Sequence, residues 1–289
     1  MELLYISKWG GVLNLFDNEL FWLTNVDGIT QAATDISSVV IGGIDGDQVN
    51  NIQAQPRGIV FDMRIKSGVN VEYAKRAVLE IIKLKQTCKL QWTQNDRTLV
   101  ISGVVNEIVM PRFNNEVTMQ VAIHCGVPYW EELTDVLSEI SEAKGLHYFT
   151  DDPYGMLYFP DDEGIPLGEY DTSRTRTFYN AGDVSVGMII EVLAVRTVTN
   201  PIIYDQNGDF FGVGYGSKTV TMQEGDTLII NTKVGEKSVT MNGENLLDKV
   251  KPQSTWLQLE AGENEFSINS DDTAVDNMIF TLIYRQRYI

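Results

Sequence analysis

The strongest constraint on the fold is a succession of short alternating segments separated by tight-turn dipeptides. Within residues 179–289, Asn207-Gly208 and Asn242-Gly243 both divide such segments. Asn-Gly favours two-residue hairpin loops because both residues tolerate positive φ. Turn signals recur there about every 8–12 residues, a spacing typical of antiparallel β-sandwiches. We therefore expect residues 179–289 to form a β-sandwich.

Residues 1–133 predict an antiparallel sheet that carries one helix. Residues 58–65 alternate, which places Ile59, Phe61 and Met63 on one face of a strand. Asn70 is a favoured N-cap residue, and apolar side chains recur at helical spacing in residues 71–82 after it. A helix lying on the sheet would bury both apolar faces. Further strands are expected at 19–24, 89–92, 97–105 and 116–124, with turns at 95–96 and 114–115.

Residues 134–178 are expected to connect the two domains through a helix and an irregular segment. A helical pattern begins at Pro128 and ends at Gly145, its predicted C-cap. The apolar face of this helix would comprise Trp130, Leu133, Leu137 and Ile140. Residues 147–178 lose the periodicity but keep aromatic side chains, so we expect them to pack irregularly. The fold class predicted is mainly β, with one or two helices.

The charge of the chain argues against nucleic acid as a partner. There are 40 Asp plus Glu and 22 Lys plus Arg, which gives a formal net charge of −18. Proteins bind nucleic acid through Lys and Arg that displace counterions from phosphate, so we expect no sequence-specific nucleic acid binding. The N-terminus lacks the features of a secretory signal, and no segment reaches the roughly 20 apolar residues that span a bilayer. No membrane partner is expected.

The histidines and cysteines do not predict a catalytic or metal site. His124 and Cys125 are neighbours in a predicted strand, where successive side chains point to opposite faces, so a Cys/His pair is not expected. His147 and Cys88 lie elsewhere, and no CxxC or Cys/His cluster is present for zinc. We expect no catalytic residues, no cofactor-binding residues, no metal ligands and no cofactor.

Acidic pairs and a glycine-rich run each have a functional and a structural interpretation. The acidic pairs are Asp151-Asp152, Asp161-Asp162 and Asp271-Asp272. We interpret them as solvated turn residues, with a surface calcium site near Asp161, Asp162 and Glu163 as the alternative. The run at 212–219 resembles a phosphate-binding loop, but its lysine does not follow the required glycine. A hairpin or bulged strand is expected there instead.

Aromatic residues of the second domain leave a carbohydrate-binding function open. Trp256, Phe210, Phe211 and Tyr215 could line a sugar site. Sandwich cores use the same residue types, so a structural role is the favoured interpretation. A glycan hydrolase would need two carboxylates held across a cleft, and neighbouring residues in a sequence do not supply that spacing.

Several segments, in their order and spacing, resemble the distal tail proteins (Dit) of tailed phages, which are siphovirus-type tail components. The segments are 26–28 (Val-Asp-Gly), 56–58 (Pro-Arg-Gly), 125–130 (Cys-Gly-Val-Pro-Tyr-Trp), 178–191, 200–203, 224–232, 235–239, 254–264 and 284–289. A short helix around Arg76 also fits the pattern. The resemblance covers nearly the whole chain and is weakest over residues 147–178.

The resemblance implies an N-terminal belt domain over residues 1–133, a connector over 134–178 and a galectin-like β-sandwich over 179–289, whose last strand can return to the N-terminal domain. It implies a non-enzymatic homo-hexameric ring, single or stacked, at the virion tail tip after assembly in the host cytoplasm. The ring would join the tail tube protein to a tail-associated hub, lysin or fibre and let DNA pass. A receptor-binding protein and the tape measure protein are further candidate partners. The alternative function is attachment to host glycans through the sandwich.

Overall fold

The computed structural model of this chain describes residues 2–30, 32–43, 45–111, 117–138, 143–144, 169–170, 175–271 and 277–289. The chain divides into two compact units, which we call unit 1 (Met1–Thr134 with Arg287–Ile289) and unit 2 (Asp135–Gln286). Strands dominate both units, and the described residues contain one α-helix. The predicted mainly β fold class is therefore confirmed. No helix among the described residues is long and apolar enough to cross a membrane.

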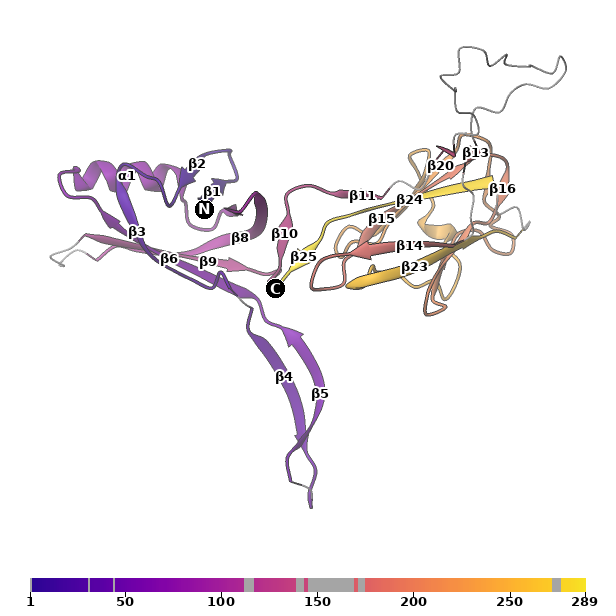
Figure 1. The fold of residues 1–289 in the computed structure, drawn as a ribbon, viewed down its shortest axis with the longest axis horizontal. Coiled ribbons are helices and arrows are strands. Elements are labelled where there is room, and N and C mark those ends of the chain that lie inside the picture. The colour runs from indigo at the N-terminus through magenta and orange to yellow at the C-terminus, as the bar shows by residue number, and fades with distance from the viewer. Residues whose placement is uncertain are drawn as a thin grey trace, which may run out of the picture. The chain divides into compact units, whose positions relative to one another are not determined.

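Unit 1 is built on one antiparallel sheet, drawn from indigo to magenta in Figure 1. Its strands, in spatial order, are β2 (Val12–Asn14), β1 (Glu2–Ser7), β7 (Thr87–Gln94), β8 (Arg97–Val109), β9 (Thr118–Cys125), β6 (Arg57–Ile65) and β3 (Phe21–Asp27). β10 (Trp130–Glu132) pairs with β8 and with β25 (Arg287–Tyr288), so the last residues of the chain complete this unit.

The predicted alternation and the predicted helix of unit 1 are both confirmed. Ile59, Phe61 and Met63 of β6 are buried in one core. Helix α1 (Val71–Ile81) begins after Asn70, whose side-chain oxygen accepts a hydrogen bond from the Tyr73 amide at 3.1 Å. This cap satisfies one of the amides that a helix N-terminus leaves unpaired. The helix buries Ala74 and Val78 beneath it.

A second hairpin of unit 1 lies outside this sheet. Strands β4 (Thr34–Val40) and β5 (Asp47–Ala54) pair only with each other and project from the end of the sheet (Figure 1). Sequence patterns gave no prediction for this segment. We call residues 34–54 the arm.

Unit 2 is a sandwich of two antiparallel sheets around one core, as predicted. The first sheet contains, in order, β11 (Val136–Ser138), β24 (Met278–Tyr284), β15 (Met188–Ala194), β20 (Thr227–Asn231), β21 (Ser238–Met241) and β22 (Glu244–Asn245). The second contains β14 (Thr175–Asn180), β23 (Gly262–Asn269), β17 (Ile202–Asp205) and β18 (Phe210–Gly212). Smaller elements are β12 (Ala143–Lys144) with β13 (Glu169–Tyr170), β16 (Val198–Thr199) with β19 (Thr221–Met222), and the 3-10 helix η1 (Leu247–Lys249). The two sheets share one core, which contains Ile190 and Phe280 from the first sheet and Phe266 from the second.

The two Asn-Gly dipeptides form different turns. Asn242 and Gly243 both have positive φ, at 50° and 86°, which is the predicted two-residue hairpin between β21 and β22. At the other dipeptide only Gly208 has positive φ. There the Asp205 carboxylate accepts hydrogen bonds from the amides of Asn207 and Asp209, both at 2.9 Å, and so closes a longer loop.

The helix predicted from Pro128 is wrong over the described residues. Trp130–Glu132 form β10 and Val136–Ser138 form β11. Trp130 is buried, but Leu133 and Leu137 are about half exposed, so these three residues do not share a helical face. Pairing with β8, β25 and β24 satisfies the backbone of both strands, and this tertiary pairing overrides the local periodicity. Ile140, Gly145 and most of 147–178 lie outside the described residues.

Candidate functional site

The two cysteines are free thiols of the core and are poor nucleophiles. Burial raises the pKa of Cys88 to about 12 and that of Cys125 to about 11, so both thiols stay protonated at neutral pH. His124 lies on the exposed face of β9, opposite Cys125. His147 lies outside the described residues. No cluster of three metal-ligating side chains occurs among the residues that the structure describes.

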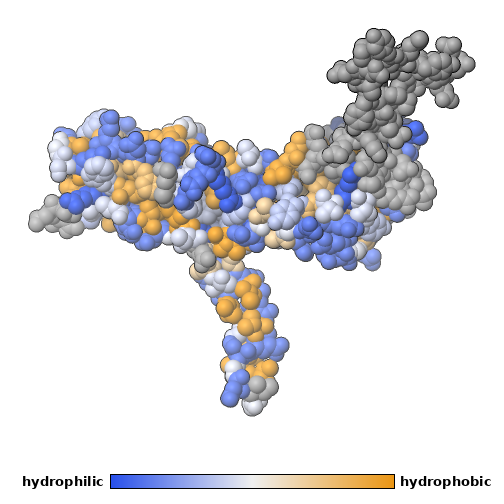
Figure 2. Space-filling view, viewed as in Figure 1, coloured by the Kyte–Doolittle hydropathy of each residue, from blue (hydrophilic) through white to orange (hydrophobic). Residues whose placement is uncertain are grey.

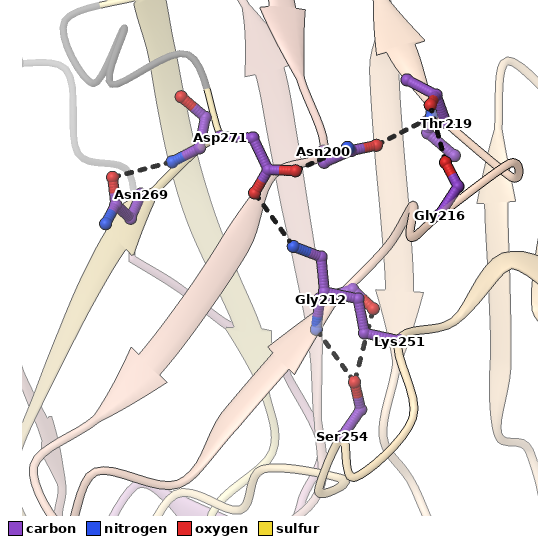
Figure 3. Close-up of polar contacts among 10 residues, drawn as sticks. Asn200, Gly212, Gly216, Thr219, Lys251, Ser254, Asn269 and Asp271 are labelled. Atoms are coloured by element: carbon purple, nitrogen blue, oxygen red, sulfur yellow. Dashed lines mark hydrogen bonds and ion pairs between the residues drawn. The ribbon is translucent and has the colours of Figure 1, made fainter.

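The glycine-rich run at 212–219 forms a hairpin, as predicted, and its glycines serve a polar network (Figure 3). Gly214 has a φ of 82°, and a Cβ there would collide with the side-chain oxygen of Asn200. That oxygen accepts a hydrogen bond from the Val220 amide at 2.9 Å. Lys218, the lysine of the run, donates to the Asp248 carbonyl at 2.8 Å. The run therefore packs against the side-chain oxygen of Asn200, and its lysine is bonded to the Asp248 carbonyl. This is not the arrangement of a phosphate-binding loop.

Asp271 is an exposed turn residue, as predicted, and it also belongs to the same network. Its two carboxylate oxygens accept hydrogen bonds from Asn200 Nδ2 at 2.7 Å and from Lys251 Nζ at 3.1 Å. These contacts tie the start of β17, the loop after η1 and the end of β23 together at one end of the sandwich (Figure 3). The other acidic pairs and Asp272 lie outside the described residues, and so does the candidate calcium site at Asp161, Asp162 and Glu163.

The four candidate aromatics do not form one platform. Phe210 and Phe211 are neighbours in β18 and point to opposite faces of the strand. Phe211 is fully buried and packs on Trp256, with ring centroids 4.8 Å apart, whereas Phe210 packs on Tyr204. Lys237 and Lys218 lie 5.3 Å and 5.9 Å from the rings of Trp256 and Tyr215. A sugar platform needs rings that face solvent together, so this arrangement favours the structural role.

The arm is the surface of the described chain that most needs a partner. Every residue of β4 and β5 is exposed, and an isolated two-stranded hairpin is only marginally stable in water. Ile36 and Ile52 are directly paired, with exposed fractions of 58% and 63%. Figure 2 shows hydrophobic side chains along the arm. Exposed apolar clusters of this kind mark sites of protein association.

The strand register makes the arm amphipathic. Residues that are paired across two strands point to the same face, and the face alternates along each strand. One face therefore carries most of the apolar side chains, which are Ile36, Val40, Val49, Ile52 and Ala54, beside Thr34, Ser38 and Asp47. The other face carries Asp35, Ser37, Gln48, Asn51 and Gln53 with Val39. A register shift after Ser37 leaves Asn50 unpaired and keeps Val49 on the apolar face.

A buried arginine and a buried tryptophan hold the root of the arm. Arg57 is 2% exposed, and its Nη1 donates to the carbonyls of Gly28 and Ile29 at 3.2 and 2.7 Å. Trp130 Nε1 donates to the Ile29 carbonyl as well, at 3.1 Å. Gly28 has a φ of 82°, and a Cβ there would collide with the Gly58 carbonyl oxygen. The chain therefore enters and leaves the arm through backbone that is fixed to the core of unit 1.

Sequence reasoning missed the arm for two physical reasons. The register shift breaks the period of two that identifies a strand. The apolar residues of the arm also pack against no core of their own chain. Their sequence therefore lacks the regular alternation of apolar and polar residues that a half-buried strand shows. Two signals were available: the glycines at 42, 43 and 46, and a complete lack of Lys and Arg between residues 32 and 56.

Comparisons with known proteins find a family match for residues 181–288 and a similar fold over the whole length of the chain. Residues 181–288 match the family SPP1_Dit, described as the C-terminal domain of siphovirus-type tail components. No curated protein matches the chain by sequence. The crystal structure of the Dit protein of phage SPP1, a hub of the adsorption apparatus in phages infecting Gram-positive bacteria, is similar with a TM-score of 0.69. The identity is 11%, and the match covers 99% of each chain.

Chains from the phage P2 baseplate in its activated conformation, with Ca and with Sr, match at TM-scores of 0.46 and 0.45. Their identity is 12%, and each match covers 98% of this chain and 97% of the baseplate chain. The family match covers most of unit 2, and the SPP1 match extends over both units. Residues 181–288 therefore match the family of C-terminal domains of siphovirus-type tail components, and the chain as a whole has a fold similar to that of the SPP1 Dit protein.

Proposed function

We propose that this chain is a non-enzymatic structural component of the distal tail, or baseplate hub, of a bacteriophage tail or a phage-derived tail particle. Six copies form a ring that joins the tail tube to the tip hub or fibre and lets DNA pass through its centre. The observation that carries the proposal is the arm, because its exposed apolar face requires a protein partner. The family of unit 2 and the fold of the whole chain support the same role.

A partner for the arm is present in every preparation of this protein, namely another copy of the chain. Contacts between two different surfaces of identical chains generate closed rings when the rotation per copy closes. The arm and the sheet of unit 1 are different surfaces, so one kind of chain suffices for a ring. The firmly anchored root of the arm favours a fixed rotation per copy, since it fixes the direction in which the arm leaves the sheet.

The partners above and below the ring follow from its place in a tail. The tail tube protein docks on one face, and a tail-associated hub, lysin or fibre docks on the other. A receptor-binding protein and the tape measure protein are further partners at the virion tail tip, after assembly in the host cytoplasm. The net charge of −18 suits a channel, because an acidic protein does not retain the DNA that slides past it.

The properties of the thiols support a structural role over catalysis. A nucleophilic cysteine has a lowered pKa, and burial raises the pKa of both cysteines in this chain. Carbohydrate binding by the sandwich is the alternative function. The separation of Phe210 from Phe211 across β18 counts against it, and silence on a glycan array would remove it.

Negative-stain electron microscopy of the purified chain tests the proposal. We expect ring-shaped particles whose class averages have six-fold symmetry and a central channel. The matched experiment uses the variant Ile36→Ser with Ile52→Ser, which should give single small particles. Single particles from the natural chain at every concentration would contradict the proposal, and so would rings formed equally well by the variant.

A further inference from the structure

We propose that the arm of one copy seats its apolar face in a groove on unit 1 of a neighbouring copy, between helix α1 and the end of β8. This inference rests on the proposed ring and identifies the two surfaces that would close it. The groove has a volume of about 960 Å³ and lies beside α1. Its lining residues are Glu72, Lys75, Leu79, Ile82, Lys83, Leu84, Ile108 and Met110.

The groove and the arm match in polarity. Five of the groove residues are apolar, and Leu79 and Leu84 among them are 39% and 53% exposed. The apolar face of the arm presents β-branched side chains to solvent, which suit a groove floored by Leu, Ile and Met. Joining the two surfaces would remove both from water, and this burial is the main driving force of protein association.

The groove and the arm also match in charge. Asp35, Asp45 and Asp47 are exposed, and residues 32–56 contain no Lys or Arg, so the arm carries only negative charge. The groove carries Lys75 and Lys83 against a single acid, Glu72. The chain has a net charge of −18, whereas this groove carries more basic than acidic side chains. Complementary charge of this kind selects the orientation and the partner in an interface.

The arm has the length to use the groove of another copy. Seven residues of β4 span about 24 Å at the rise of a strand, and eleven residues of α1 span about 16 Å at the rise of a helix. Every residue of β4 and β5 is exposed within its own chain, so the arm does not occupy its own groove. Because arm and groove are different surfaces, each copy can use both at once, which propagates the contact around a ring.

Mixing two defective chains tests this inference. The arm variant is Ile36→Ser with Ile52→Ser, and the groove variant is Lys75→Glu with Lys83→Glu and Leu84→Ser. All these side chains are at the surface or partly exposed, so both variants should fold. Val234→Ser is the matched control, because Val234 is an exposed apolar residue of unit 2, 83% exposed. Assembly is measured by sedimentation velocity of the full chain.

We expect each variant alone to be monomeric and the control to assemble like the natural chain. An equimolar mixture should form dimers and stop there. In such a dimer the intact arm of the groove variant occupies the intact groove of the arm variant, and the two remaining surfaces are both defective. A groove variant that assembles normally, while the arm variant does not, would overturn the inference but leave the proposed function standing. A natural chain that never assembles would count against the proposed function itself.

Charge exchange provides a second, independent test. Lys75→Glu with Lys83→Glu should weaken assembly at least tenfold, and adding Asp45→Lys with Asp47→Lys to the same chain should restore at least part of that loss. Restoration shows that the arm and the groove meet in the assembly. A quadruple variant that assembles no better than the groove double variant would contradict the pairing, provided that the arm double variant alone folds, as judged by its circular dichroism spectrum.

Discussion

Arg57 has an unusual environment for a charged residue. It is 2% exposed, and its Nε and Nη2 have no hydrogen-bond partner among the described residues. Its Nη1 bridges two consecutive carbonyls, and burial lowers the pKa of its guanidinium. A buried cation that has hydrogen-bond partners for only some of its N–H donors lowers the stability of the folded state. Its retention at the root of the arm is consistent with a role in fixing the direction of the arm.

Replacing Arg57 tests this role at the scale of a residue. Arg57→Met removes the donor to the Gly28 and Ile29 carbonyls, and loss of buried hydrogen bonds should reduce the free energy of unfolding by about 1–3 kcal/mol. Amide hydrogen exchange at residues 28–34 should accelerate as well, because the root loses its anchor. Arg57→Lys keeps the charge but has a shorter side chain that does not place its nitrogen at the position of Nη1, and it should show the same acceleration. Exchange rates unchanged in both variants would show that Trp130 alone fixes the root.

The buried thiols predict how stability depends on pH. The pKa of Cys88 rises from 9.0 to about 12 on folding and that of Cys125 from 9.0 to about 11. The folded state therefore holds these protons more tightly, so the stability they contribute is fully present below pH 9 and is lost as the pH rises toward the folded values. The free energy of unfolding should fall between pH 9 and 10, measured by urea titration. Cys88→Ala with Cys125→Ala should flatten this fall, and an unchanged slope would contradict the assignment.

At the scale of elements, the arm is a paired hairpin whose side chains pack against no other element of the described chain. Its apolar face makes no core contact within its own chain, so polar substitution there should cost the folded monomer little. Ile36→Ser with Ile52→Ser should change the free energy of unfolding of the monomer by less than about 0.5 kcal/mol, as is usual for surface sites. Chemical denaturation at a concentration too low for assembly measures this change. A larger loss would show that the arm is packed within the monomer.

The polar network at the end of the sandwich is the opposite case, since its members depend on one another. Gly214→Ala would force φ near 82° on a residue with a Cβ and would push that Cβ into Asn200, at a cost of about 2 kcal/mol or more. Asn200→Gly removes the clashing oxygen and tolerates the positive φ of this position, but loses the bonds to Val220 and Asp271. The double variant should be less destabilised than the sum of the single variants, by about 1 kcal/mol. Additive effects in urea denaturation would refute the contact.

Sequence patterns within one strand, helix or turn predicted the fold well. Features that depend on contacts between distant segments were not predicted. The alternation of β6, the Asn70 cap and the Asn242-Gly243 hairpin are local and were confirmed. The false helix at Pro128 arose because Trp130, Leu133 and Leu137 happen to recur at helical spacing, while distant strands decide their structure. Asn200 and Asp271 are 71 residues apart, so no local pattern announces their bond. The arm was missed because its register shift breaks the alternation and its apolar side chains pack against no core of their own chain.

At the scale of the whole molecule, the two units present different kinds of surface. Unit 2 has a closed core, whereas unit 1 presents an acidic amphipathic arm and a basic-edged apolar groove. The proposed contact joins apolar surfaces and also pairs opposite charges. Because these charges lie at the surface, salt should screen their attraction, while apolar burial keeps most of its strength.

Salt dependence therefore provides a prediction at this scale. Raising the ionic strength from 0.05 to about 0.5 M shortens the Debye length and should weaken assembly of the natural chain measurably, without abolishing it. The Lys75→Glu, Lys83→Glu variant should respond in the opposite sense, since salt would screen its repulsion from the acidic arm. Sedimentation velocity across a salt series measures both. The same response in both chains would show that these lysines do not face the arm.

We expect copies of this chain to close into a ring, and native mass spectrometry of the purified chain across a concentration series would detect that ring by its mass. The expected species has six copies, about 195 kDa from the chain mass of 32.5 kDa, or twice that mass for two stacked rings, with few intermediates between monomer and ring. A single species of 32.5 kDa at every concentration would contradict it.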